Sequence, residues 1–297
     1  MMHLSNVQRN SAPAATRFIF GAMALFAISS LVLADESMAD AKGHYANVNG
    51  LKIYYEMHGQ SDGLTPPLVL LHGGGSTITT SFGSMLTNLS KKRQIIAIEQ
   101  QGNGHTADIE GRPFTFEQSA DDTVALLQQL KIEKADFFGY SNGGNVALQI
   151  AIRHPAFVRK LVLASTMYRR DGVYPIFWEF MKNATLENMP KELQDAYLKV
   201  APTPGNLQSM HDKSRDRMLA FKDIRPEEIH AIHTPTLLMI GDSDIIRPEH
   251  AVEMLRLLPH AQLAVLPGID HMQMVKRVDW QLSMIDTFLD MPMPEMQ

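Results

Sequence analysis

The sequence predicts an α/β fold built on a mostly parallel sheet with helices on both faces. Strand-like and helix-like segments alternate from about Gly43 onward, which is the order of a parallel sheet with crossover helices. Several strand-like segments are continuous apolar runs, as expected of strands that are covered on both faces. Ser141 lies in a glycine-rich turn between a strand-like run and a helix-like run. Together these observations predict a site at the carboxyl edge of the sheet.

Eight segments have the composition of strands, and four have the periodicity of helices. Asn49-Gly50 joins the first two strand-like segments and favours a type I′ hairpin. Ala120, Val124 and Leu127 recur at helical spacing and predict an amphipathic helix around them. The expected strands are residues 45–48, 52–56, 67–71, 94–98, 135–138, 160–164, 236–240 and 262–266, and the expected helices are residues 117–130, 145–152, 248–258 and 274–289.

Residues 168–233 break this alternation. The segment is rich in methionine, aromatic residues and proline, has short helical patterns, and contains no convincing strand. Because it follows directly on the strand at 160–164, we expect it to form a helical cap over the carboxyl edge of the sheet, where ligands bind in open α/β folds.

Composition excludes some classes of function. The 297 residues carry a formal net charge of −5 and no basic block, which argues against nucleic-acid binding. The chain has no cysteine, so thiol catalysis, disulfides and cysteine-ligated metals are excluded.

The first 39 residues have the pattern of a secretory signal. Arg9 and Arg17 precede an apolar run over residues 18–33, and small residues follow it. The pattern predicts cleavage after Ala34 or Ala39 and a periplasmic or secreted protein, with residues 40–297 as one domain. An uncleaved membrane anchor over residues 18–34 is the alternative, although the run is slightly short for a spanning helix.

The run from Phe137 to Gly144 contains Gly-x-Ser-x-Gly centred on Ser141. A serine between a strand and a helix must sit in a tight, strained turn that exposes its hydroxyl at the N-terminus of the helix. Glycines on either side remove side chains that would collide in such a turn. We therefore expect Ser141 to be a nucleophile.

A serine nucleophile needs a base, and a histidine base needs a carboxylate that orients it. His271 follows the last expected strand and lies at the same sheet edge as Ser141. Asp242 and Asp244 both follow the strand at 236–240. We favour Asp244 because it lies further into the loop and is better placed to reach the next loop. The chain order Ser141, Asp244, His271 is that of one known triad arrangement.

Two backbone N–H groups are the expected oxyanion donors. Asn142 directly follows the nucleophile, and Gly74 lies in the glycine-rich loop after Leu71. His72 in this loop is expected to be structural rather than catalytic.

These motifs resemble the α/β-hydrolase superfamily over almost everything after about Gly43. The chain is most similar to the small capped members described as esterases, enol-lactonases, carboxylesterases or cofactor-free haloperoxidases. The resemblance implies an eight-stranded sheet with a cap between strands six and seven. One departure is clear: the family often carries Asp-x-Arg-Gly-x-Gly after strand four, and this chain has Glu99-Gln100-Gln101-Gly102-Asn103-Gly104.

We expect a serine hydrolase that cleaves carboxylic esters or lactones through an acyl-enzyme, with no cofactor and no metal. Its expected partner is a small-molecule ester or lactone, not nucleic acid, and no membrane partner is expected beyond export. Hydrolysis of C–C or amide bonds by the same residues is an alternative, and so is a low-turnover binding or sensing protein on the same fold. The acyl group and the oligomeric state stay open.

Overall fold

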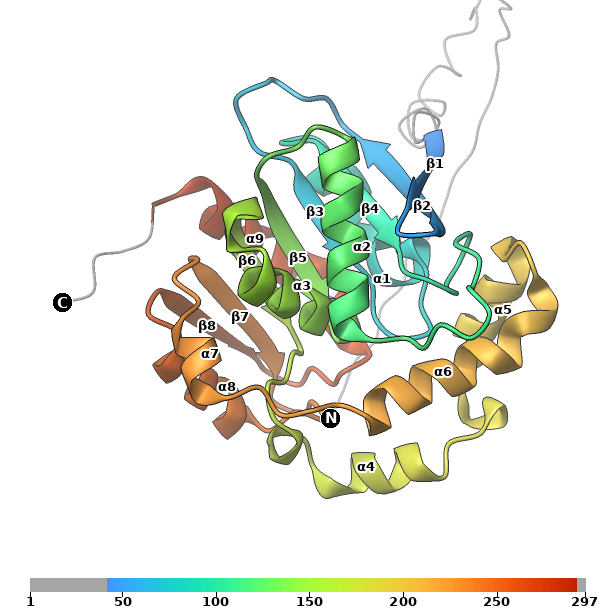
Figure 1. Ribbon diagram of the computed structural model, residues 1–297. Helices are drawn as coiled ribbons and strands as arrows, with labels where there is room; N and C mark the ends of the chain where they lie inside the picture. The colour runs from blue at the N-terminus through green and yellow to red at the C-terminus, as the bar shows by residue number, and fades with distance from the viewer. Residues whose placement is uncertain (1–41, 293–297) are drawn as a thin grey trace, which may run out of the picture. The chain divides into compact units, whose positions relative to one another are not determined.

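The computed structural model describes residues 42–292, which form an eight-stranded sheet flanked by helices (Figure 1). The expected signal over residues 1–39 lies outside the described residues. The strand order is β1-β2-β4-β3-β5-β6-β7-β8. Strands β1 and β2 are antiparallel to each other, β2 is antiparallel to β4, and all other neighbours are parallel. The strands are β1 Lys42–Val48, β2 Leu51–His58, β3 Leu68–Leu71, β4 Ile95–Glu99, β5 Ala135–Tyr140, β6 Val158–Ala164, β7 Thr236–Gly241 and β8 Ala261–Leu266.

All eight expected strands are confirmed, and their local chemistry explains them. The hairpin between β1 and β2 turns at Asn49 and Gly50, whose φ angles of 49° and 79° suit a type I′ turn. Every residue of β3 and β4 is buried, as the continuous apolar runs required. Strand β3 lies between β4 and β5, so the glycine-rich loop after β3 is adjacent to the turn that carries Ser141.

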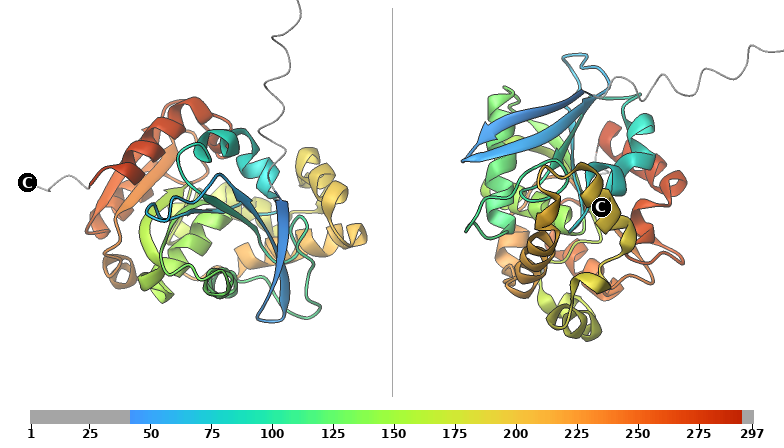
Figure 2. Two further views of the ribbon diagram at one scale, coloured as in Figure 1. Left: turned by 90° about the horizontal axis from the view of Figure 1, so that it is seen from above. Right: turned by 90° about the vertical axis from the view of Figure 1, so that its right-hand side faces the viewer.

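Helices cover both faces of the sheet (Figures 1 and 2). One hydrophobic core joins the sheet to α2, α3 and α8, and a second core joins it to α1 and α9 on the other face. These helices are α1 Ile78–Leu89, α2 Phe116–Gln129, α3 Asn142–Arg153, α8 Pro248–Leu257 and α9 Val278–Asp290.

Two helices differ from the sequence-based expectation. Helix α1 was not expected, because threonine, serine and glycine make its sequence a weak helix former. It is stabilised by a capping box between Thr77 and Thr80 and by a buried face that includes Phe82 and Met85. Helix α9 begins at Val278 rather than at residue 274, since the chain before it forms a separate 3-10 turn over Gln273–Val275.

The segment between β6 and β7 is helical and contains α4 Pro175–Lys182, α5 Lys191–Val200, α6 Leu207–Leu219 and α7 Pro226–His230. Helices α4 and α6 contact each other and lie beyond the carboxyl edge of the sheet, whereas α7 packs beside α8 (Figure 1). Within residues 42–292, no helix has the length and apolar character needed to cross a bilayer.

Substitution of Gly143 by alanine tests how tightly the start of α3 packs on β3. A Cβ atom at Gly143 would collide with the carbonyl oxygen of Leu71, which is backbone and cannot move aside. We expect Gly143→Ala to lower the free energy of unfolding by about 3 kcal/mol or more in urea titrations. Gly205→Ala is the matched control, because nothing lies within 4 Å of a Cβ atom there. An equal effect of the two substitutions would contradict this packing.

Candidate active site

Ser141 occupies the strained turn that its sequence context predicted. It separates β5 from α3 and has φ 54° and ψ −118°, a left-handed conformation that is costly for a residue with a side chain. The neighbouring glycines permit this turn. A Cβ atom at Gly139 would collide with the carbonyl of Gly143, and one at Gly144 would collide with the Thr166 hydroxyl. The surrounding packing therefore holds the Ser141 hydroxyl at the N-terminus of α3.

His271 links Ser141 to Asp244. Its Nε2 atom lies 2.9 Å from Ser141 Oγ, and its Nδ1 atom lies 2.8 Å from Asp244 Oδ1. Because the carboxylate can only accept, Nδ1–H donates to Asp244 and Nε2 is left to accept the Ser141 proton. The hydroxyl of Tyr140 also donates to the carbonyl oxygen of His271 at 2.7 Å, which fixes the backbone of the histidine.

Asp244 is 3% exposed and receives hydrogen bonds on both carboxylate oxygens. Burial alone would raise the pKa of this carboxyl. The hydrogen bond and charge of His271, together with hydrogen bonds from Ser165 and the Ile246 N–H, outweigh burial and lower the pKa below its ordinary value. Asp242 is exposed and accepts from the Gly268 N–H at 2.8 Å. Of the two candidate carboxylates, Asp244 is therefore the one in contact with His271.

Ser165 is a further candidate for the site that was not expected from the sequence. Its hydroxyl donates to Asp244 Oδ2 at 2.5 Å, and its backbone has φ 52°. It follows β6 directly, at the same sheet edge as Ser141, and that position was the available signal. We regard it as a positioning residue, because it reaches the reacting atoms only through Asp244 and His271.

Two backbone N–H groups face the cavity beside Ser141 without a partner. Within residues 42–292, the N–H groups of Gly74 and Asn142 donate to no protein acceptor. Both residues line the same cavity as Ser141 and His271. The arrangement can therefore offer two donors to an anionic oxygen formed next to Ser141.

His72 has a structural position. Its Nδ1–H donates to the Gly73 carbonyl at 2.7 Å, and its Nε2 accepts the Gln100 N–H at 3.0 Å. Burial lowers the pKa of this imidazole, which agrees with a neutral ring whose two nitrogens are both engaged. It ties the loop after β3 to the loop after β4.

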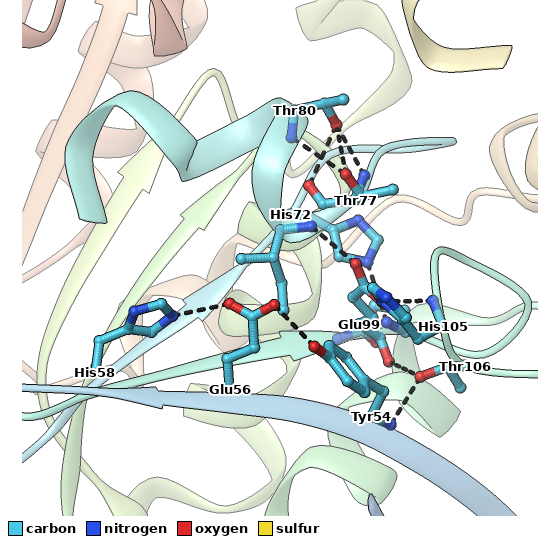
Figure 3. A network of polar contacts seen from close by, with 11 residues as sticks. Tyr54, Glu56, His58, His72, Thr77, Thr80, Glu99, His105 and Thr106 are labelled. Carbon is cyan, nitrogen blue, oxygen red and sulfur yellow. Dashed lines mark hydrogen bonds and ion pairs between the residues drawn. The ribbon is translucent and has the colours of Figure 1, made fainter. Parts of the chain in front are cut away.

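Glu99 supports the same loops through the polar network in Figure 3. One carboxylate oxygen accepts a hydrogen bond from the Ile78 N–H at the start of α1. The other accepts from the backbone N–H of His105 and also lies 2.9 Å from Nδ1 of the same histidine. A Cβ atom at Gly104 would collide with this carboxylate. The glutamate at the departure from the family motif therefore anchors the helix that follows the Gly74 loop.

The family motif has an arginine that this chain lacks, and a guanidinium from another part of the chain contacts the residue at that position. Gln101 stands at the arginine position, and its side-chain oxygen accepts from the guanidinium of Arg112. The same guanidinium donates to Asp122 at 2.7 Å. Arg112 thus holds the loop after β4 against α2.

A cavity of about 340 Å³ lies between Ser141 and the cap helices. From helix α4 of the cap, Phe177, Phe180 and Met181 line it. Ile176 is 78% exposed and Trp178 packs on Arg170 instead. The apolar lining side chains are Met167, Val173, Phe177, Phe180, Met181, Ala184, Met189, Leu193, Met210, Met218, Ile245, Ile246, Met272 and Val275. Among the described residues, no cluster of histidine, aspartate and glutamate has the arrangement of a metal site.

Comparison with known proteins agrees with the fold and the motifs. The family model described as alpha/beta hydrolase fold matches residues 66–217, and the chain belongs to this family. It is a hydrolase of the α/β-hydrolase fold.

Individual relatives are distant. The chain is 27% identical to a 2-hydroxymuconate semialdehyde hydrolase of Pseudomonas sp. (strain CF600), over 75% of this chain and 86% of that protein. It is 28% identical to the human serine hydrolase BPHL, over 75% of this chain and 78% of that protein. The crystal structure of an enol-lactonase from Burkholderia xenovorans LB400 superposes with a TM-score of 0.67 at 23% identity, covering 84% of this chain and 100% of that one, and shows the shared fold.

Ser165→Ala tests the positioning of Asp244. Loss of this donor leaves Asp244 Oδ2 without its partner, so the carboxylate is held less firmly against His271 and also becomes more basic. We expect kcat/KM to fall about tenfold, the equivalent of roughly 1.4 kcal/mol. The acidic limb of its pH profile should move to higher pH. Ser243→Ala is the control, because that hydroxyl contacts exposed Asp242. An unchanged pH profile in Ser165→Ala would assign the residue to packing alone.

His105→Gln tests the Glu99 network through the pH dependence of stability. The hydrogen bond and charge of Glu99 outweigh burial and raise the pKa of His105. Protonated His105 therefore stabilises the fold below its unfolded pKa of about 6.5, and the contribution is lost as pH rises through the folded pKa. We expect urea unfolding to show a larger loss of stability in His105→Gln at about pH 5.5 than at about pH 9.

The control for this measurement is His233→Gln, which removes an exposed imidazole. A loss that is equal at both pH values in His105→Gln would contradict the assigned interaction.

Proposed function

We propose that the protein is a serine hydrolase that cleaves carboxylic esters or lactones through an acyl-enzyme. One observation carries the proposal: Ser141 Oγ lies 2.9 Å from His271 Nε2, on a histidine that is itself 2.8 Å from a buried carboxylate. This is the geometry in which a serine hydroxyl can lose its proton as it attacks a carbonyl carbon.

In the first half of the reaction, Ser141 Oγ bonds to the carbonyl carbon while its proton passes to His271 Nε2. The carbonyl electron pair moves onto the oxygen, which faces the N–H groups of Gly74 and Asn142. When the pair returns, the C–O bond to the leaving alcohol breaks and the alcohol takes the proton from Nε2. Asp244 stabilises the positive imidazolium and holds its tautomer throughout.

In the second half, water replaces the alcohol. His271 Nε2 takes a proton from water, the hydroxide oxygen attacks the acyl carbon, and the oxyanion forms again at Gly74 and Asn142. The bond between the acyl carbon and Ser141 Oγ then breaks, Oγ recovers the proton from Nε2, and the free acid leaves. The apolar lining of the cavity favours a substrate with an apolar acyl or aryl part.

Cleavage of a C–C or amide bond by the same residues is the second candidate. It is favoured by the names of two further relatives, a putative carbamate hydrolase of Caulobacter sp. (strain K31) at 26% identity and a proline iminopeptidase of Lactobacillus helveticus at 25% identity. The triad geometry alone does not choose between these bonds, since each reaction needs the same nucleophile, base and oxyanion donors.

Fluorophosphonate labelling combined with p-nitrophenyl ester kinetics tests the proposal. We expect the probe to label the wild type at Ser141, and Ser141→Ala and His271→Ala to lose about 10⁴-fold or more in kcat. His260→Ala is the control, since this histidine is exposed and lies at the amino end of β8, opposite the sheet edge that carries the site. Labelling that persists in Ser141→Ala would contradict the serine-hydrolase proposal.

A substrate panel separates the two candidates. It contains p-nitrophenyl esters of rising chain length, lactones and amides. Turnover of esters or lactones is expected. A protein that is labelled at Ser141 but inactive on every ester and lactone would favour the C–C or amide candidate.

A further inference from the structure

A second hollow lies on the other face of α6 from the catalytic cavity. It is lined by the first turn of α2, the loop before that turn, and the C-terminal part of α6 with the residues that follow. The two hollows share no lining residue.

Arg217 is a buried cation in this hollow with no anionic partner. It is 5% exposed, and its side chain forms no hydrogen bond or ion pair with any residue in the range 42–292. Its Nε atom is fully buried and unsatisfied. The guanidinium carbon lies 4.9 Å from the ring centroid of Phe116 and 5.8 Å from that of Phe114. Aromatic faces compensate only part of the cost of removing a charge from water, so the structure leaves this guanidinium short of an acceptor.

The N-terminus of α2 adds a second source of positive potential. Thr115 caps the Gln118 N–H, while the N–H groups of Phe116 and Glu117 have no acceptor among the described residues. The first N–H groups of a 14-residue helix attract an anion through hydrogen bonding and the helix dipole. This feature is independent of Arg217 and lies at the same hollow.

The other charged groups around the hollow are mostly neutralised. Arg112 is bound to Asp122, Lys213 to Asp108, and Asp216 to Arg215. Lys222 is exposed and has no partner in the described part of the chain. The exposed carboxylate of Glu117 also lines the hollow and carries the opposite charge. Arg217 and Lys222 outweigh this one carboxylate, so the unpaired groups around the hollow carry a net positive charge.

The walls of the hollow are apolar. Phe116 and Phe221 pack edge to face with ring centroids 6.0 Å apart, and Pro113 and Phe114 extend the surface. These rings are themselves only 5–7% exposed, so the apolar surface open to a ligand belongs to the exposed residues Pro113 and Ala220. A carboxylate attached to an aryl or short alkyl group would cover this surface and place its charge on Arg217.

We propose that this hollow binds an organic carboxylate whose anionic end meets Arg217 and the N-terminus of α2, and whose apolar part covers Pro113 and Ala220. The site is separate from the hydrolytic site and goes beyond the proposed function. Because α6 comes from the cap and α2 from the sheet domain, a bound carboxylate bridges the two. The opposite face of α6 lines the catalytic cavity, so occupancy of this site stabilises the position of a cavity wall.

NMR titration of the Ser141→Ala protein tests the site with benzoate as the probe. We expect saturable amide shifts at Phe116 and Glu117 and at least tenfold weaker binding in Arg217→Met. Arg217→Lys should keep measurable affinity, because it retains the charge. Arg256→Met is the matched control for loss of one arginine, since Arg256 is exposed on α8, and it should bind benzoate like its parent.

Two further ligands test the chemistry. Benzamide has the same shape without the charge and should shift Phe116 and Glu117 at least tenfold less at the same concentration. Inorganic phosphate has charge without the apolar part and should bind more weakly than benzoate. The proposal is overturned by benzoate shifts confined to Gly74 and Asn142, which would place the ligand in the catalytic cavity. Equal benzoate affinity in Arg217→Met, or no shift at α2, would overturn it as well.

Discussion

The backbone of Ser141, held at φ 54° between β5 and α3, is the constraint on which the rest of the site depends. This conformation is unfavourable for a residue with a side chain, and packing around it compensates the cost. Gly143 lies against the carbonyl of Leu71, which joins the start of α3 to the end of β3. This contact also sets the distance between the Ser141 turn and the Gly74 loop. It therefore fixes the Ser141 hydroxyl relative to the N–H groups of Gly74 and Asn142.

Parallel strands bring the remaining groups to this turn. Ser141 follows β5, Ser165 follows β6, Asp244 follows β7 and His271 follows β8, and these four strands are consecutive neighbours. Side chains that are distant in the sequence therefore meet at one edge. Each is then fixed by a specific contact, such as the hydroxyl of Ser165 on Asp244 or that of Tyr140 on the His271 carbonyl.

Much of this could be predicted from the sequence because the signals are local. Apolar runs, the Asn49-Gly50 turn and the glycines around Ser141 define the strands and the turn at Ser141 without reference to distant residues. The choice of Asp244 over Asp242 required only the position of each within its loop. Ser165 was missed since its role depends on the register between β6 and β7, which no local pattern encodes.

Other features escaped prediction because tertiary contacts outweigh local preference. Helix α1 is a poor helix by composition, but Phe82 and Met85 are buried against the sheet and Glu99 accepts an N–H at its start. In the sequence, nothing distinguishes Arg217 from the other charged residues of the cap segment. Only the fold shows that it is buried over two phenylalanine rings without an anionic partner, on the face of α6 that points away from the catalytic cavity.

Rapid-quench mass spectrometry of the wild type during turnover of p-nitrophenyl butyrate tests the role of Ser141 most directly. We expect a transient butyryl adduct on the peptide that contains Ser141, formed with the first equivalent of p-nitrophenol and lost as the acid is released. Release of p-nitrophenol with no adduct, or an adduct on a different residue, would contradict it.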